Sequence, residues 1–90
     1  MRDGRIVEGG VAAQTAQTIA NIEALLAEAG ATLGDVVKTM CFLTDMGTFT
    51  EFNEAYAAGF GDHRPARSTI EASALPGGMA VEIEAWAYKL

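Results

Sequence analysis

The chain is short of cysteine and of basic residues, and each shortage excludes a class of protein. With Cys41 as its single cysteine, it cannot form an internal disulfide framework. One cysteine and one histidine, His63, are also too few for a Cys-based structural zinc site. Six Lys and Arg residues against twelve Asp and Glu give a net charge of −6, and no basic cluster is present that would attract a phosphate backbone. We therefore expect no binding to nucleic acids.

Long hydrophobic runs are absent too. No run approaches the roughly 20 residues that span a bilayer, so we expect no membrane association. Residues 1–5 carry charges with no apolar core behind them, which is not the pattern of a signal peptide. These features favour a soluble protein of a reducing compartment, the cytoplasm. Half of the 90 residues are apolar and 20% are charged, which is typical of one globular domain, residues 1–90.

Apolar periodicity predicts two helices. The first covers residues 11–29 and ends before Gly30, a residue type that readily adopts the left-handed conformation of a helix C-terminus. The second begins at Thr48, where Glu51 three residues on completes a capping box, and runs for about three turns. Its aromatic side chains recur at helical spacing and stop near residues 59–61: Phe49, Phe52, Tyr56 and Phe60.

Three segments have the composition of strands: residues 36–44, 67–74 and 79–88. The first is β-branched and aromatic on both alternating faces, which is typical of a strand covered on two sides. Pro-Gly chemistry at residues 75–78 predicts a turn, so that the last two strands form a terminal hairpin. The order helix, strand, helix, strand, strand predicts an α+β fold, in which one mixed β-sheet has both helices packed on one face.

The last strand has two unlike faces. One carries small and branched apolar residues that suit packing against helices: Met79, Val81, Ile83, Ala85 and Ala87. The other carries two carboxylates beside two aromatic rings: Ala80, Glu82, Glu84, Trp86 and Tyr88. Two helices cannot cover both faces of a sheet, so the second face is either wet or covered by another copy of the chain. Aromatic rings among charges favour the second alternative, a homo-oligomer.

Arg67 is the strongest candidate for a binding residue. It opens a strand directly after a proline-containing loop, on a polar face shared with Thr69, Glu71 and Ser73. A guanidinium held there offers a planar fork that binds a carboxylate at two points. The plainer alternative is a strand-end arginine paired with Glu71 or Glu82.

The other candidates have plain structural alternatives as well. Glu82 and Glu84 point to the same side of a strand, where adjacent carboxylates either tune one another for acid–base chemistry or form a solvated face. Cys41, within an apolar strand, is expected to be a small buried hydrophobe rather than a nucleophile. His63 has no partner in the sequence, and no phosphate loop, nucleophile elbow or metal motif is present.

Eight stretches form a pattern along the chain: Gln14-Thr15, Asn21-Ile22, Asp35 to Thr39, Phe42 to Met46, Phe52 to Tyr56, Pro65 to Thr69, Leu75-Pro76 and Val81 to Ala85. Together they resemble the RidA family, also called YjgF/YER057c/UK114 and, in older usage, the L-PSP endoribonucleases. Their order and spacing match the family over nearly all of the chain. The combination of Pro-Ala-Arg-Ser with Glu-Ile-Glu-Ala makes the resemblance specific.

The resemblance implies a chorismate-mutase-like fold, assembled as a homotrimer whose sheets form a central barrel with ligand clefts at the subunit interfaces. It also implies an activity, the hydrolysis of reactive 2-imino or enamine acids to 2-keto acids and ammonia, as in 2-iminobutanoate/2-iminopropanoate deaminases. Neither a cofactor nor a metal is implied. By this resemblance Arg67 would bind the substrate carboxylate, Glu82 would orient the hydrolytic water, and the backbone at Thr69 would line the cleft.

Relative to the family pattern, the chain is short at its front. Residues 4–9 match the loop that follows the family's first hairpin, so we expect a partial RidA-like domain lacking the usual N-terminal β-hairpin, the first two family strands. The family tyrosine and serine that help to close the cleft would be missing with that hairpin. One sheet edge would then be unpaired.

Two functions from different classes stay open. A deaminase needs Arg67 and Glu82 together, whereas a non-catalytic protein that binds a small carboxylate needs Arg67 alone. A third, ribonuclease activity, is suggested by the older family name. The acidic balance of the chain and its lack of paired histidines disfavour that function.

Overall fold

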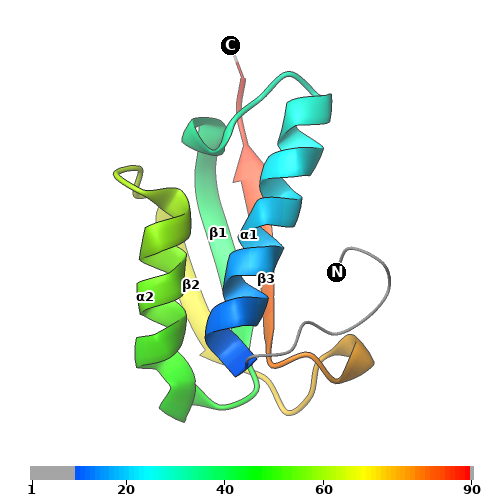
Figure 1. Cartoon of the computed structure of the whole chain (residues 1–90), viewed down its shortest axis with the longest axis vertical. Coiled ribbons are helices and arrows are strands. Elements are labelled where there is room, and N and C mark those ends of the chain that lie inside the picture. The colour runs from blue at the N-terminus through cyan, green and yellow to red at the C-terminus, as the bar shows by residue number, and fades with distance from the viewer. Residues whose placement is uncertain (1–9, 90) are drawn as a thin grey trace.

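Two helices pack on one face of a three-stranded sheet (Figure 1). The computed structural model describes residues 10–89. The helices are α1 (Gly10–Glu28) and α2 (Phe49–Phe60), and the strands are β1 (Val36–Leu43), β2 (Ala66–Glu71) and β3 (Val81–Ala87). Short 3-10 turns precede β1, α2 and β3 at Leu33–Asp35, Met46–Thr48 and Pro76–Gly78. The predicted α+β fold, a mixed sheet with both helices on one face, is confirmed.

The central strand of the sheet is β1, in the order β2-β1-β3. β2 is parallel to β1 and is reached through α2, whereas β3 is antiparallel to β1. The predicted terminal hairpin is therefore wrong, because β2 and β3 lie on opposite sides of β1. The connection between them passes the end of β1, where Ala72 N donates to Leu43 O and Thr44 N donates to Ala80 O. A hairpin needs a short loop between neighbouring strands, and residues 72–80 form a much longer connection.

The helix ends lie within one or two residues of the predicted positions. α1 is followed by Gly30, with a φ of 77°, and α2 by Gly61, with a φ of 64°. The capping box predicted at Thr48 does not form, because the Thr48 hydroxyl donates to Asp45 O at 2.7 Å instead. The Asp45 side chain accepts from Gly47 N at 2.8 Å, which caps the turn before α2. Within residues 10–89, no helix has the length and hydrophobicity of a membrane span.

The core lies between the helices and the face of the sheet that they cover. Its buried residues are Val11, Ile19, Val36, Cys41, Leu43, Phe52, Tyr56, Phe60, Val81 and Ile83. Cys41 is fully buried, as the sequence predicts. The two helices approach each other closely at Gly59, where an added Cβ would lie 2.7 Å from Ile19 Cδ1. A larger residue at Gly59 would therefore force the Ile19 side chain to shift.

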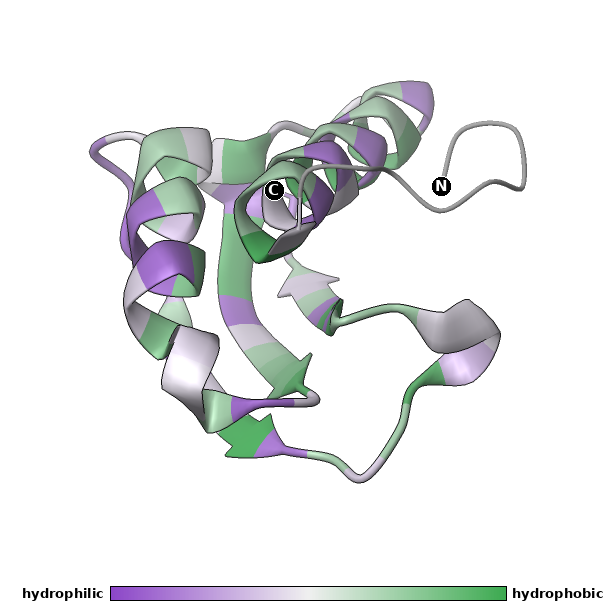
Figure 2. Ribbon diagram, turned by 60° about the horizontal axis from the view of Figure 1, so that its bottom comes forward, coloured by the Kyte–Doolittle hydropathy of each residue, from purple (hydrophilic) through white to green (hydrophobic). Residues whose placement is uncertain are grey.

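We call the opposite face of the sheet, which neither helix covers, the open face (Figure 2). Strand register places on it Lys38, Met40, Phe42, Ser68, Ile70, Glu82, Glu84 and Trp86. Ile70 and Trp86 are each 47% exposed, and Lys38 Nζ lies 5.1 Å from the centre of the Trp86 ring. The unlike faces predicted for the last strand are observed, since Val81 and Ile83 are buried while Trp86 is exposed.

Candidate functional site

Arg67, the second residue of β2, lies on the helix-covered face of the sheet and reaches under α2. Its Nη1 donates to Asn53 Oδ1 at 2.7 Å. Its guanidinium carbon lies 4.7 Å from the ring centre of Tyr56, and 5.5 and 5.7 Å from those of Phe49 and Phe52. The half-buried cation is thus held by one amide oxygen and three aromatic rings, whose faces attract positive charge.

The alternative in which Arg67 pairs with Glu71 or Glu82 is wrong. Glu71 Oε1 accepts from the backbone N–H of Met46 at 2.8 Å, so this carboxylate holds the turn before α2. Glu82 projects from the open face of the sheet, on the side away from Arg67. Asn53, which sequence reasoning did not single out, is the partner instead. The sequence does contain a sign of this role. Asn53 comes one helical turn after Phe49, on the face of α2 that carries the aromatic side chains.

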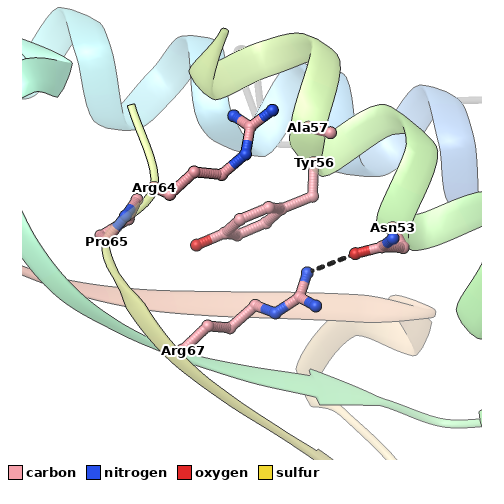
Figure 3. Close-up of a pocket in the computed structure, with 6 residues that line it drawn as sticks. All are labelled: Asn53, Tyr56, Ala57, Arg64, Pro65 and Arg67. Atoms are coloured by element: carbon pink, nitrogen blue, oxygen red, sulfur yellow. Dashed lines mark hydrogen bonds between the residues drawn. The ribbon is translucent and has the colours of Figure 1, made fainter. Parts of the chain in front are cut away.

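A pocket of about 520 Å³ opens beside Arg67, between α2 and the start of β2 (Figure 3). It is lined by Asn53, Tyr56, Ala57, Arg64, Pro65 and Arg67. Figure 3 shows the Tyr56 ring between the guanidinium groups of Arg64 and Arg67. Sequence reasoning did not predict Arg64 as a lining residue, because its place depends on how the loop after α2 folds back. The volume lies within the range of small-molecule sites.

A buried polar cluster supports this pocket from the sheet. The hydroxyl groups of Tyr56 and Thr39 form a hydrogen bond of 2.7 Å, and the Cys41 thiol donates to Thr39 Oγ1 at 3.8 Å. Burial raises the pKa of the Tyr56 phenol, against the smaller lowering effects of its Thr39 hydrogen bond and the two nearby arginines. Burial raises the pKa of the Cys41 thiol as well. Both groups are therefore neutral near pH 7, and Cys41 is not an activated nucleophile.

Thr69 lies two residues after Arg67 on the same face of β2, opposite Cys41 in the register. Its hydroxyl oxygen is buried and has no hydrogen-bond partner among residues 10–89. The pocket beside Arg67 does not include Thr69, which lies one pleat further along the strand. The role expected for its backbone, lining a substrate cleft, stays a prediction.

The structure does not bring Glu82 together with Arg67. Glu82 is opposite Phe42 in the β1–β3 pair, whereas Arg67 is opposite Thr39 in the β1–β2 pair. Residues 39 and 42 of β1 point to opposite faces, so the two candidate side chains lie on opposite faces of the sheet. Glu84 shares the open face with Glu82, as predicted. One small molecule cannot contact both Arg67 and Glu82 of the same chain.

His63 has a structural contact. Its Nε2 lies 2.6 Å from Val36 O and ties the loop after α2 to the start of β1. Among the described residues, no three His, Cys, Asp or Glu side chains are grouped so that they could hold a metal ion.

Comparison with known proteins gives a consistent set of relatives. The family model described as Endoribonuclease L-PSP matches residues 1–89. A RutC family protein of Pyrococcus abyssi is 48% identical over 86 residues, covering 96% of this chain and 68% of the relative. The 2-iminobutanoate/2-iminopropanoate deaminase of Escherichia coli is 41% identical over 86 residues, covering 92% of this chain and 67% of that enzyme.

The fold comparison agrees with the sequence comparison. A crystal structure of a YjgF/YER057c/UK114 family member from Mycobacterium tuberculosis superposes with a TM-score of 0.88 at 44% identity, covering 92% of this chain and 71% of that one. The chain spans about two thirds of the length of its curated relatives, from 57% to 70% in eight of them. The N-terminal hairpin that the sequence predicts to be missing would precede the described residues.

Proposed function

The chain belongs to the RidA/YjgF/L-PSP family, and from this premise we propose that it hydrolyses small 2-imino or enamine acids to 2-keto acids and ammonia. In this reaction water adds to the imine carbon and the carbon–nitrogen bond breaks. The water oxygen becomes the ketone oxygen, and the nitrogen leaves as ammonia. The Escherichia coli relative is a 2-iminobutanoate/2-iminopropanoate deaminase, which supports this substrate class.

The observation that carries the proposal is the Arg67 guanidinium at the pocket wall. Asn53 uses one of its N–H groups, and the rings of Phe49, Phe52 and Tyr56 fix its plane. The remaining N–H groups can bind both oxygens of a substrate carboxylate, which is the strongest pairing that arginine makes. Partial burial among aromatic rings lowers the local dielectric constant and strengthens this attraction.

Glu82 is the proposed residue that orients the hydrolytic water. Because Arg67 and Glu82 lie on opposite faces of one sheet, they can serve one substrate only if they come from two copies of the chain. We therefore propose a homotrimer with its open faces turned inward and a cleft at each subunit interface. The exposed apolar side chains of the open face, Ile70 and Trp86, are the kind of surface that such an assembly buries.

The proposed reaction needs only a small catalytic contribution from the protein. An imine is already electrophilic, so fixing the carboxylate and holding one water at the imine carbon supplies most of the acceleration through proximity. The proposal includes neither a cofactor nor a metal. It treats residues 1–90 as one RidA-like domain and the cytoplasm as the compartment in which it works.

A second candidate function is the binding of a small carboxylate without turnover. One observation favours it: Arg67 and its pocket are complete within a single chain, whereas Glu82 is not part of them. Ribonuclease activity remains disfavoured. The net charge of −6 repels a phosphate backbone, and the single histidine lies against a backbone carbonyl.

A coupled assay separates the two functions. A pyridoxal-phosphate threonine dehydratase is run on threonine, with and without this protein, while release of 2-ketobutyrate is followed. The deaminase proposal predicts faster release, lost in both Arg67→Ala and Glu82→Gln, with Lys89→Ala as an exposed control. Unchanged release together with retained 2-ketobutyrate binding would establish the binding protein instead.

A further inference from the structure

Arg64 brings a second positive charge to the pocket, and the proposed reaction leaves it unused. Arg64 and Arg67 both line the same cavity, with the Tyr56 ring between their guanidinium groups (Figure 3). The six lining residues include these two arginines and no acidic residue. A single carboxylate bound at Arg67 would leave the charge of Arg64 without a counter-charge in the pocket.

The position of Arg64 is fixed by the backbone around it. Its Nη1 donates to Gly61 O and also lies 3.3 Å from His63 O. Gly61 follows the last residue of α2, where the helix dipole attracts a cation. Although Arg64 is in an exposed loop, its side chain is therefore held toward the pocket rather than free in solvent. The other N–H groups of the planar fork are left for a ligand.

Neither guanidinium is paired with a carboxylate within residues 10–89. Arg67 binds an amide oxygen, and Arg64 binds backbone carbonyls. Two arginines in one pocket, neither with a carboxylate partner in the described part of the chain, are notable in a protein whose acidic residues outnumber its basic ones by twelve to six. Two fixed cations on either side of an aromatic ring form a site that is complementary to a short dianion with its charges at its two ends.

We propose that the preferred ligands of this pocket are 2-imino and 2-keto acids that carry a second, distal carboxylate. Arg67 binds the carboxylate next to the imine or ketone, Arg64 binds the distal one, and the carbon chain between them crosses the Tyr56 ring. This inference rests on the proposed function, because it assigns the first carboxylate to Arg67. It makes Arg64 a residue that determines specificity, with no part in the hydrolytic step.

The test compares two stable ligands that differ only in the distal group, 2-oxoglutarate and 2-oxopentanoate. Isothermal titration calorimetry measures both dissociation constants for the full chain. We expect 2-oxoglutarate to bind about fivefold more tightly, which is the upper end of the range of an exposed ion pair. Arg64→Gln should remove this preference while leaving 2-oxopentanoate binding within twofold of the unmodified protein. Lys89→Gln, which removes an exposed charge outside the pocket, should leave the preference intact.

The outcomes separate this inference from the function on which it rests. Equal affinity for the two ligands overturns the dicarboxylate preference and leaves the Arg67 site in place. Binding of neither ligand overturns the proposed function and this inference together. A preference that falls equally in Arg64→Gln and Lys89→Gln reflects overall charge and overturns the role of Arg64. Arg64→Lys keeps the positive charge but not the planar guanidinium, so this variant should retain part of the preference for 2-oxoglutarate. If Arg64→Lys loses the preference completely and also binds 2-oxopentanoate more weakly, Arg64 only supports the loop.

Discussion

The two faces of the sheet differ in whether a single chain supplies all the residues of the proposed site on that face. On the helix-covered face, Arg67 has its amide partner, its aromatic neighbours and a pocket. On the open face, Glu82 stands among apolar side chains that are partly exposed, Ile70 and Trp86 among them. The difference indicates that the proposed carboxylate site is complete within one chain, whereas any step that needs Glu82 depends on a second copy.

The largest expected effect is on the covered face. Phe52, on the inner face of α2, is fully buried and its ring lies beside the Arg67 guanidinium, so Phe52→Ala should lower the free energy of unfolding by about 3–5 kcal/mol. Urea unfolding followed by circular dichroism measures this change. Leu25→Ala is the control, because Leu25 is 66% exposed and its loss should cost less than about 0.5 kcal/mol. Equal losses in the two variants would contradict the assignment of the core to this face.

The next effect concerns the open face. Ile70→Glu places a charge in the proposed interface, where burial of an unpaired carboxylate is costly, so the assembly should dissociate into folded single chains. Light scattering measures the molar mass, and circular dichroism reports the fold. Leu25→Glu makes the same kind of change on the exposed side of α1 and should leave the assembly intact. A wild-type chain that is already single would contradict the interface on the open face.

A smaller effect follows from the raised pKa of Cys41. The ordinary thiol pKa is 9.0 in the unfolded chain, and burial raises it in the folded protein. Above pH 9 the unfolded state therefore binds fewer protons than the folded state. The contribution of this group to the free energy of unfolding is fully present below pH 9 and falls as the pH rises above it. For this single group the slope cannot exceed about 1.4 kcal/mol per pH unit.

Urea unfolding at a series of pH values tests this dependence, with Cys41→Ala as the comparison. The variant should lose the part of the decline that begins near pH 9, while the contribution of Tyr56, whose ordinary pKa is 10.0, remains at higher pH. Identical pH profiles for the two proteins would show that burial does not raise the pKa of the Cys41 thiol.

The smallest effect concerns the support of Arg67. Asn53→Ala removes the amide oxygen that holds Nη1 and leaves the three rings in place, so the guanidinium should be less well oriented but still present. We expect 2-ketobutyrate to bind about fivefold more weakly, corresponding to the loss of about 1 kcal/mol. Glu54→Ala changes the next residue of α2, which is exposed, and serves as the control in the same calorimetric titration. Equal affinities would remove Asn53 from the site.

Periodicity along the chain was sufficient to predict the helices, the strands and the unlike faces of β3. The spacing of apolar residues within one helix or strand shows which of its faces is buried. The apolar face of β3 and the aromatic face of α2 could therefore be identified from the sequence. The terminal hairpin was predicted wrongly for the opposite reason. The Pro-Gly turn at residues 76–78 specifies a local bend, but which strand lies beside β3 depends on the parallel β1–β2 pairing made through α2.

The candidate site was predictable only in part. The position of Arg67 after a proline loop indicated an arginine suited to binding anions, whereas its partner Asn53 comes from α2, 14 residues earlier in the chain. Arg64 lines the pocket from the loop after α2, where its guanidinium donates to Gly61 O, a contact between residues that the sequence pattern does not reveal. Predicting that Arg67 and Glu82 lie on opposite faces would have required the register of both strand pairs. The alternation of residues within each strand does not show which face of one strand matches which face of another.

The most direct test of the central claim, that Arg67 and Glu82 serve one substrate from two different chains, is complementation between inactive variants. Arg67→Ala and Glu82→Gln chains are unfolded together, refolded as a mixture and assayed for acceleration of 2-ketobutyrate release. We predict that each variant alone is inactive and that an equal mixture recovers about a quarter of wild-type activity, since random assembly restores both residues at about one cleft in four. A mixture as inactive as its two components, formed from chains that do assemble, would contradict the claim.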